Sequence, residues 1–282
     1  MIKIVVCLKQ VPDTKTVRID PKTKNIIREG VPSILNPYDE NALEEALRIR
    51  DQWGGTVTAL SMGPLQAIEI LQKALNMGAD RAILLADRAF AGADTLATGY
   101  TLATVIKQLE ADVILCGAEA VDGCTGQVGP IIAEKLGWPQ FTYVDQIRVL
   151  ADTVLIRREL NDRYETYRCK FPLVACIKRG ANLPRGEVKV PNEPEIHTSE
   201  DYDFEKEKIG MNGSATAVVH ITSSDPSVSS FFEVDSSLSV KERIQSIIYG
   251  GMIPKKVKLE RGTIKSLTEM ILEEPLIQKR LS

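Results

Sequence analysis

Glycines recur at every third position in one segment near the middle of the chain, and this spacing is the clearest chemical signal in the sequence. Gly123, Gly126 and Gly129 follow an apolar run at 112–115 and precede a helix-like run at 131–136. Glycine lets the backbone adopt positive φ and approach a ligand closely, and the start of a helix offers unpaired N–H groups to an anion. Such a loop after a parallel strand commonly binds nucleotide phosphates. The pattern therefore indicates a phosphate site, with a plain tight turn between strand and helix as the alternative.

Side chains that often carry catalysis are scarce. The chain has 2 histidines, His197 and His220, so a histidine-based triad or metal site is not expected. Its 5 cysteines show no CxxC spacing, and Cys7, Cys116 and Cys176 lie in apolar runs where buried, inert thiols are expected. The glycine spacing matches neither GxGxxG nor GxxxxGK followed by Ser or Thr. We therefore expect a binding site with no catalytic side chain and no metal.

The composition limits the class of protein. With 282 residues and 44% hydrophobic content, the chain can form one large core and an appended part. A net charge of -3 gives no overall basic surface for nucleic acid. No segment approaches the roughly 18 consecutive apolar residues of a membrane span, so membrane insertion is not expected. The start of the chain, Met1–Val6, is typical of a strand rather than a signal peptide, which favours the cytoplasm.

Strand-like and helix-like segments alternate over the first half of the chain. Apolar runs typical of buried strands lie at 2–8, 56–62, 81–86 and 112–116. Helices are predicted from Asn36 to Gly54, from Pro64 to Gly78, from Asp94 to about Leu109, and at 131–136. At the first of them, Asn36 is expected to cap the helix and Pro37 to take the first helical position. The alternation predicts an α/β fold with a doubly wound, mostly parallel sheet and helices on both faces.

Beyond Pro139 the pattern changes to hairpins and then to a polar arm. Strand-like runs lie at 141–150, 153–160, 164–170 and 171–177, and a further surface hairpin is expected at 16–28. From Lys178 on, prolines predict an extended arm rather than a second core, with late helices at 239–249 and 264–272. We expect a nucleotide-binding α/β domain at 1–178, including the hairpin region at 141–177, and a C-terminal arm at 179–282.

Short motifs in the first 192 residues resemble those of a known family. They are Cys7–Asp13, Asn36–Asp39, Leu60–Pro64, Ala74–Arg81, Leu136–Gln140, Ile156–Glu159, Phe171-Pro172 and the glycine-rich loop. With these motifs in this order, the sequence resembles the β subunit of an electron transfer flavoprotein. The resemblance implies a fold related to adenine-nucleotide hydrolase-like α/β domains, a partner α subunit, and a nucleotide bound in this subunit.

The resemblance also implies which residues hold the nucleotide. They are Cys7, Asn36, Pro37, Tyr38, Asp39, Met62, Asp122, Gly123, Cys124, Thr125, Gly126, Gln127, Val128 and Gly129. Cys7 would contribute its backbone, whereas Thr125 and Gln127 can donate hydrogen bonds to phosphate oxygens. Cys124 departs from the family pattern, which usually has an acidic residue there, so one negative charge beside the phosphates is missing. For Asn36 the alternative role is a helix cap alone, and for Met62 a place in the core.

Two sorts of family member differ in the nucleotide that they hold. The forms Asn36–Asp39 and Gln127–Pro130, with the long tail, resemble the electron-bifurcating group of anaerobic metabolism, in which the β subunit binds FAD. The resemblance then implies that FAD accepts hydride from NADH. One electron passes to ferredoxin or flavodoxin, and the other passes through the α-subunit FAD to a flavin dehydrogenase, acyl-CoA dehydrogenase-like or other. The alternatives are a non-bifurcating β subunit with structural AMP, or a nucleotide-binding sensor or ATP-using enzyme of the same fold.

The start of the arm corresponds in position to the family's dehydrogenase-recognition loop. Leu183 would be the apolar anchor of this loop, with Arg179 and Arg185 as its basic rim. A solvated linker is the alternative. The late helices have apolar stripes too short for a core of their own, so we expect them to lie on the α subunit.

Overall fold

The computed structural model describes residues 1–13, 18–19, 26–27, 32–151, 153–217 and 239. The chain divides into two compact units, Met1–Ser224 and Asp225–Ser282, and every helix and strand named below belongs to the first. Apart from Ser239, the predicted late helices at 239–249 and 264–272 lie outside the described residues.

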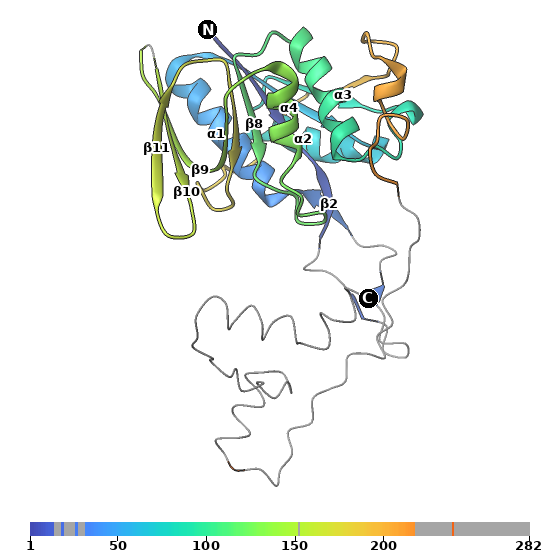
Figure 1. The fold of residues 1–282 in the computed structure, drawn as a ribbon, viewed down its shortest axis with the longest axis horizontal. Helices are drawn as coiled ribbons and strands as arrows, with labels where there is room; N and C mark the ends of the chain where they lie inside the picture. The colour runs from blue at the N-terminus through green and yellow to red at the C-terminus, as the bar shows by residue number, and fades with distance from the viewer. Residues whose placement is uncertain (14–17, 20–25, 28–31, 152, 218–238, 240–282) are drawn as a thin grey trace, which may run out of the picture. The chain divides into compact units, whose positions relative to one another are not determined.

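A nine-stranded sheet forms the centre of the first unit (Figure 1). Its strands, in spatial order, are β11 (Tyr164–Cys169), β10 (Val154–Glu159), β9 (Gln140–Val149), β12 (Leu173–Ile177), β8 (Val113–Gly117), β1 (Ile2–Cys7), β6 (Gly55–Met62), β7 (Arg81–Leu85) and β13 (Glu195–His197). The neighbours from β9 to β13 pair in parallel, whereas β10 pairs antiparallel with both β9 and β11. The predicted mostly parallel sheet with an added hairpin region is therefore confirmed.

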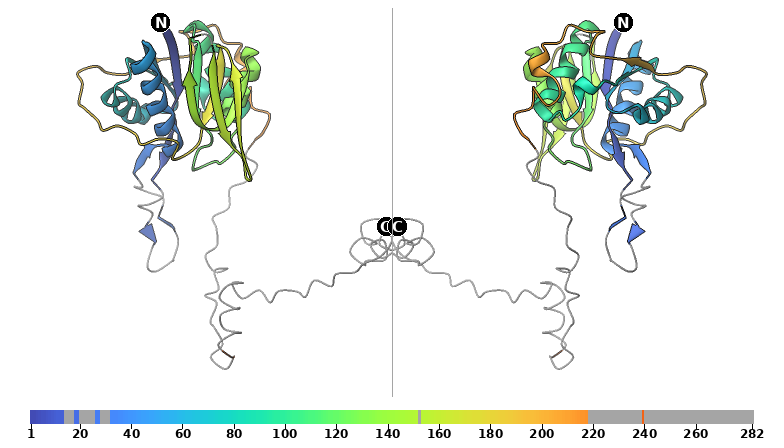
Figure 2. Two further views of the ribbon diagram at one scale, coloured as in Figure 1. Left: turned by 90° about the vertical axis from the view of Figure 1, so that its left-hand side faces the viewer. Right: turned by 90° about the vertical axis from the view of Figure 1, so that its right-hand side faces the viewer.

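Helices cover both faces of this sheet, as the side views in Figure 2 show. Helices α1 (Pro37–Trp53) and α2 (Ile68–Met77) pack on one face, and α3 (Thr95–Gln108) and α4 (Val128–Leu136) pack on the other. Because successive strand residues point to opposite faces, β1 places Ile4 and Val6 in the first core and Val5 and Cys7 in the second. The central strands are thus buried on both sides, which explains their continuous apolar runs.

Local signals explain most helix ends. Gly54 and Gly78 follow the last residues of α1 and α2 at positive φ, and Gly137 does the same after α4. The carboxylate of Asp94 accepts hydrogen bonds from Leu96 N and Ala97 N, which caps α3. The prediction that the Asn36 side chain caps α1 is wrong. Asn36 occupies the cap position without a cap hydrogen bond, because its amide reaches another loop.

Residues 178–217 run over the α/β unit, add the last strand to its sheet and finish beside the start of α3. Strand β13 pairs with β7, and Arg81 on β7 forms two hydrogen bonds of 2.6 Å with Glu195 on β13. Farther along, Phe204 packs edge-on against Phe90 with ring centroids 5.4 Å apart, and Ile209 is buried in the second core. The compact unit therefore extends past residue 178, where we expected the domain boundary.

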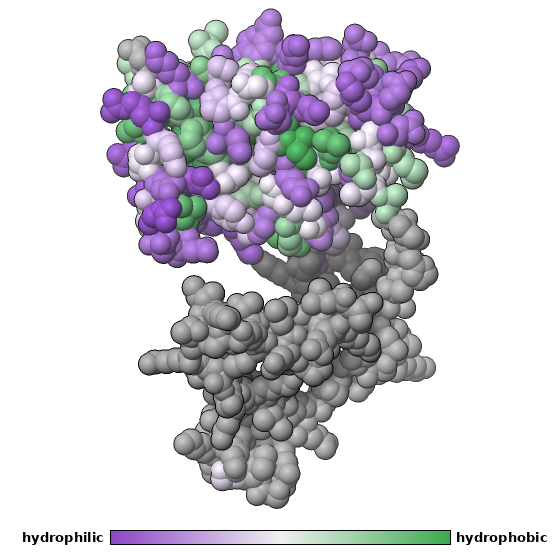
Figure 3. Space-filling view, in the orientation of Figure 1, coloured by the Kyte–Doolittle hydropathy of each residue, from purple (hydrophilic) through white to green (hydrophobic). Residues whose placement is uncertain are grey.

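Several smaller elements complete the unit. Strands β2 (Gln10–Pro12) and β5 (Ser33–Leu35) pair antiparallel, as do β3 (Arg18–Ile19) and β4 (Ile26–Ile27), and the second pair confirms the expected hairpin. Short 3-10 helices lie at Leu65–Ala67, Arg88–Phe90 and Lys206–Lys208. On the face shown in Figure 3, hydrophilic residues are interspersed with small hydrophobic patches. Among the described residues, every helix is too short or too polar to cross a membrane.

Candidate nucleotide-binding site

The sequence segments predicted to hold a nucleotide meet at the carboxyl edge of the sheet. Strands β8, β1 and β6 are neighbours, so their last residues bring together Gly117, Cys7 and Met62. Helix α1 starts beside them, because Asn36 N donates to Lys9 O at 3.0 Å just after β1. The four predicted segments therefore share one edge, where ligands of doubly wound sheets usually bind.

Asn36 ties the start of α1 to the loop that follows β8. Its amide nitrogen Nδ2 donates to Glu119 O at 2.9 Å, and its Oδ1 accepts from Val121 N at 3.3 Å. The side chain is 1% exposed, so both bonds lie in the interior. These bonds exclude the alternative that Asn36 is only a helix cap. They position the loop that precedes the glycines.

Asp39 fixes the ends of two strands. Its Oδ2 accepts from Lys9 N at 2.7 Å, and its Oδ1 accepts from Gly117 N at 3.0 Å. Burial raises the pKa of Asp39 to about 7, although these hydrogen bonds and one from Asn36 favour the charged form. Both oxygens are thus engaged inside the protein, so the carboxylate holds the backbone of the site in place.

Gly117 is a site residue that the spacing of the glycines did not reveal. A Cβ added to Gly117 would overlap Oδ1 of Asp39 and come 2.6 Å from the Cβ of Tyr38. Glycine is therefore required where α1 crosses the end of β8. Its place as the first residue after the apolar run was the available signal.

Two further side-chain pairs cross from the β1–α1 side to the same loop. The Tyr38 hydroxyl donates to Glu119 Oε1 at 2.7 Å, and this bond, with burial, raises the pKa of Tyr38 to about 12. The Lys9 ammonium donates to both oxygens of Asp122 at 2.7 Å. Lys9 and Glu119 were not among the predicted site residues, although Lys9 lies in the motif that carries the resemblance. The segment 119–122 is thus held at three points.

The loop beyond Asp122 is exposed and strongly turned. Gly126 has φ +61°, and Cys124 has φ +49°, a conformation that few non-glycine residues adopt. Gly123, Cys124 and Thr125 are exposed, and a Cβ on Gly123 would contact nothing within 4 Å. Cys124 is a free thiol at the surface, consistent with an ordinary loop cysteine. The loop therefore presents its backbone and the Thr125 hydroxyl to solvent.

Helix α4 begins directly after this loop. The Thr95 hydroxyl donates to Gln127 Oε1 at 2.7 Å, which leaves the Gln127 amide nitrogen as a donor. Val128 and Gly129 lie in the first turn of α4, where N–H groups have no acceptor within the helix. Gly129 is also needed for packing, because a Cβ there would overlap Sγ of Cys176. The donors at this helix start suit an anion.

Three buried cysteines lie under the loop. Cys116 faces Cys7 and Cys176 across adjacent parallel strands. A hydrogen bond with Cys116 and burial raise the pKa of Cys176 well above the usual thiol value. All three are buried free cysteines that pack in the core, as the sequence predicted.

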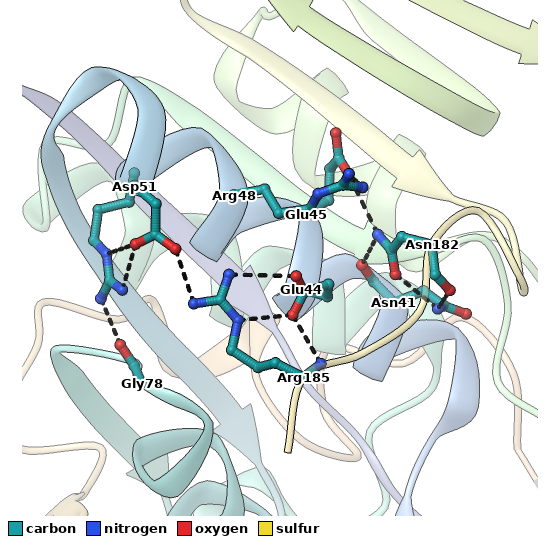
Figure 4. Close-up of polar contacts among 9 residues, drawn as sticks. Asn41, Glu44, Glu45, Arg48, Asp51, Gly78, Asn182 and Arg185 are labelled. Carbon is teal, nitrogen blue, oxygen red and sulfur yellow. Dashed lines mark hydrogen bonds and ion pairs between the residues drawn. The ribbon is translucent and has the colours of Figure 1, made fainter. Parts of the chain in front are cut away.

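The predicted partner-docking residues lie on the loop that follows β12, the neighbour of β8, and this loop is held against α1 (Figure 4). Leu183 is 90% exposed at its tip. Arg185 is not a free rim charge, because it donates to Glu44 Oε2 at 2.9 Å and to Asp51 Oδ2 at 2.8 Å. Arg179 is exposed. The loop therefore presents one apolar side chain, and Arg185 serves mainly to hold it.

Asn41 and Asn182 fasten the same loop from the other side of Leu183. Asn41 Nδ2 donates to Asn182 O at 2.9 Å, Asn182 Nδ2 donates to Asn41 O at 3.0 Å, and Gly180 N donates to Asn41 Oδ1 at 2.8 Å. Figure 4 shows Asn182 and Arg185 reaching α1 from either side of the loop tip. The start of helix α1 thus lies at the candidate nucleotide site, and the side of the same helix holds this loop.

Comparison with known proteins identifies the family. Residues 23–204 match the model of the electron transfer flavoprotein domain. The chain is 46% identical over 252 residues to the electron transfer flavoprotein subunit beta of Thermoanaerobacterium thermosaccharolyticum, covering 87% of this chain and 96% of the relative. It belongs to the electron transfer flavoprotein β-subunit family. The predicted resemblance is therefore confirmed.

Other members of this β-subunit family are also similar along most of their length. The electron transfer flavoprotein subunit beta of Clostridium acetobutylicum is 52% identical over 221 residues, covering 76% of this chain and 85% of the relative. The caffeyl-CoA reductase-Etf complex subunit CarD of Acetobacterium woodii is 48% identical over 225 residues, covering 77% and 86%. The relatives' names describe subunits of larger assemblies.

Proposed function

We propose that this chain is the β subunit of an electron-bifurcating electron transfer flavoprotein and binds FAD at the carboxyl edge of its sheet. The observation that carries the proposal is the convergence of Cys7, Asn36–Asp39, Met62 and the glycine-rich loop at that edge. The choice of FAD over AMP rests on the sequence forms at Asn36–Asp39 and Gln127–Pro130, which resemble the bifurcating group.

The donors at this edge fit a dinucleotide with a diphosphate. The first-turn N–H groups of α4, the exposed Thr125 hydroxyl and the amide nitrogen of Gln127 can all donate to phosphate oxygens. Gly126 at φ +61° brings the backbone close to a ligand. Asn36 and Asp39 fix the loop ends, so that these donors are oriented before a ligand arrives. This pre-organisation lowers the cost of ordering on binding.

When bound, FAD supplies hydride acceptance from NADH and the onward passage of single electrons, so the chain needs no acid or base of its own. We assign it a partner α subunit with a second FAD, ferredoxin or flavodoxin as the low-potential acceptor, and a flavin dehydrogenase that docks at Leu183. The complex named after caffeyl-CoA reductase supports a partner that acts on a CoA ester. We place the assembly in the cytoplasm.

A non-bifurcating β subunit with structural AMP is the second candidate. The same loop donors would hold one phosphate, and hydride transfer would then have no acceptor in this subunit. A nucleotide sensor or an ATP-using enzyme of the same fold would not require NADH or a flavin. The candidates thus differ in whether NADH reduces a flavin in the purified complex.

An anaerobic coupling assay tests the proposal. The complex with its α subunit is mixed with NADH, ferredoxin, and the dehydrogenase with its oxidised substrate. We expect ferredoxin reduction only when the dehydrogenase and its substrate are present, because the second electron needs an acceptor. Ferredoxin reduction without the dehydrogenase and its substrate, or no flavin reduction by NADH at all, would contradict bifurcation.

A further inference from the structure

Lys9 occupies a fixed position beside the glycine-rich loop. Its N–H donates to Asp39 Oδ2 at 2.7 Å, and its C=O accepts from Asn36 N at 3.0 Å. Both polar groups of its main chain are therefore held between β1 and the start of α1. The side chain leaves this anchored point and reaches Asp122, the residue directly before Gly123.

Asn36, Tyr38 and Lys9 each bind the segment 119–122, and the Lys9–Asp122 pair is the most exposed of these three contacts. The Lys9 side chain is 52% exposed and that of Asp122 is 31% exposed, whereas Asn36 is 1% exposed. An ion pair that is so exposed to solvent contributes little to the stability of the fold. Because Asn36 and Tyr38 already hold segment 119–121 from inside, the fold does not depend on this pair.

The charges of the pair matter more for a ligand than for the fold. Asp122 precedes a loop whose backbone donors suit phosphate, and a carboxylate there repels a phosphate unless it is neutralised. The Lys9 ammonium has three N–H donors that rotate freely, so it can donate to a carboxylate or to a phosphate oxygen. Its flexible stem allows this movement while its main chain stays fixed.

We propose that Lys9 binds the diphosphate of the nucleotide, and that Asp122 competes with the phosphate for the Lys9 ammonium. The proposal rests on the proposed function in requiring a nucleotide at this edge, and it adds the residue that supplies positive charge and the residue that limits affinity. Lys9 sets how tightly phosphate binds. Asp122 holds the ammonium over the loop and weakens that binding.

Competition predicts opposite effects for the two partners. Removing the ammonium weakens phosphate binding, whereas removing the carboxylate frees the ammonium and strengthens it. A pair that only held the loop in place would behave differently, because loss of either partner would loosen the same loop. The direction of the Asp122 effect therefore separates a phosphate-binding lysine from a structural ion pair.

The experiment titrates ADP and adenosine by calorimetry into the complex with its α subunit, after its nucleotide has been removed. For Lys9→Met we expect ADP to bind about ten- to a hundredfold more weakly, because a charge-assisted hydrogen bond is lost. Adenosine, which has no phosphate, should bind as in the wild type. For Asp122→Asn we expect ADP to bind about two- to tenfold more tightly, since a competing charge is removed.

Lys3 provides a matched control on the same strand. Its ammonium pairs with Glu110 at 2.8 Å at the opposite end of β1, and Lys3→Met should leave ADP affinity unchanged. Unchanged ADP affinity in Lys9→Met, or weaker ADP binding in Asp122→Asn, would overturn the proposal. Failure of the wild type to bind either ADP or adenosine would instead overturn the nucleotide site itself. Urea midpoints of both variants exclude loss of the fold as a cause.

Discussion

The amide of Asn36 donates to the carbonyl of Glu119 at 2.9 Å and so joins two segments 83 residues apart in the sequence. Asn36 is the residue before α1, where an asparagine usually caps its own helix. Here the side chain makes no cap hydrogen bond and instead holds the loop after β8. The helix start and the glycine-rich loop are consequently one structural unit.

Replacement of Asn36 by serine tests this link. Serine is an equally good cap, so α1 should keep its start. Its short side chain cannot make the two hydrogen bonds to Glu119 and Val121, so we expect ADP affinity to fall at least tenfold, which is about 1.4 kcal/mol. Calorimetry with ADP and far-UV circular dichroism measure the two properties. Wild-type ADP affinity in Asn36→Ser would show that the link does not position the loop.

Gly126→Val should abolish nucleotide retention with a modest loss of stability. A β-branched residue at φ +61° costs roughly 1–3 kcal/mol, and the side chain would stand where the backbone must approach a ligand. Gly137 is the matched control, since it has φ +68° and open space but follows α4 at its far end. Gly137→Val should lose similar stability and keep the nucleotide. Equal nucleotide occupancy in the two purified variants would contradict a role of Gly126 in binding.

Asp39 should give the protein an unusual dependence of stability on pH. Its pKa is raised from 3.8 to about 7, so the folded state binds this proton more tightly than the unfolded state. The contribution of Asp39 to stability is therefore full below about pH 4 and is lost as the pH rises through about 7. The pKa values of the neighbouring thiols Cys116 and Cys176 lie well above the usual thiol value, so both thiols stay neutral over this range.

Urea unfolding of the wild type and of Asp39→Asn between pH 4 and 8 measures this contribution. The difference in free energy of unfolding between the two should decrease steadily with rising pH. In Asp39→Asn, the amide NH₂ group would face a backbone N–H, and two donors cannot form a hydrogen bond with each other. The variant should therefore be less stable by roughly 1–3 kcal/mol at pH 5. A stability difference that is constant from pH 4 to 8, or that increases with pH, would show that Asp39 is ionised throughout.

Leu183→Asp should uncouple the partner dehydrogenase without affecting the flavins. Leu183 is 90% exposed on a loop that Asn182 and Arg185 hold against α1. An exposed apolar side chain on a fixed loop is suited to insert into a pocket of a partner protein. We expect NADH-driven flavin reduction to be unchanged and electron delivery to the dehydrogenase to fall at least tenfold. Val188, which is 73% exposed outside the clamped loop, is the control. An equal loss in Val188→Asp would argue against a specific anchor.

The strands and helices of the α/β unit were predictable because their signals are local. Gly54 and Gly78 end helices through their own backbone freedom, and Asp94 caps α3 through its own side chain. Continuous apolar runs identified the central parallel strands, because those strands are buried on both faces. The glycine spacing also located the candidate loop.

The cross-links of the site were not predictable in the same way. Lys9 and Asp122 are 113 residues apart, and their contact depends on β8 lying beside β1 in the sheet. The course of residues 178–217 likewise depends on a distant partner, since Arg81 binds Glu195 across the last strand pair. Polar pairs of this kind are specified by tertiary neighbours, and the local pattern showed only a polar, proline-rich segment.

The nucleotide content of the purified αβ complex tests the central claim most directly. Denaturation releases the bound nucleotides, and chromatography then separates FAD from AMP and counts each per protein pair. Our account predicts two FAD and no AMP, with one FAD lost when Gly126 is replaced by valine. One FAD and one AMP per pair would contradict it, because the β subunit would then hold its nucleotide without a flavin.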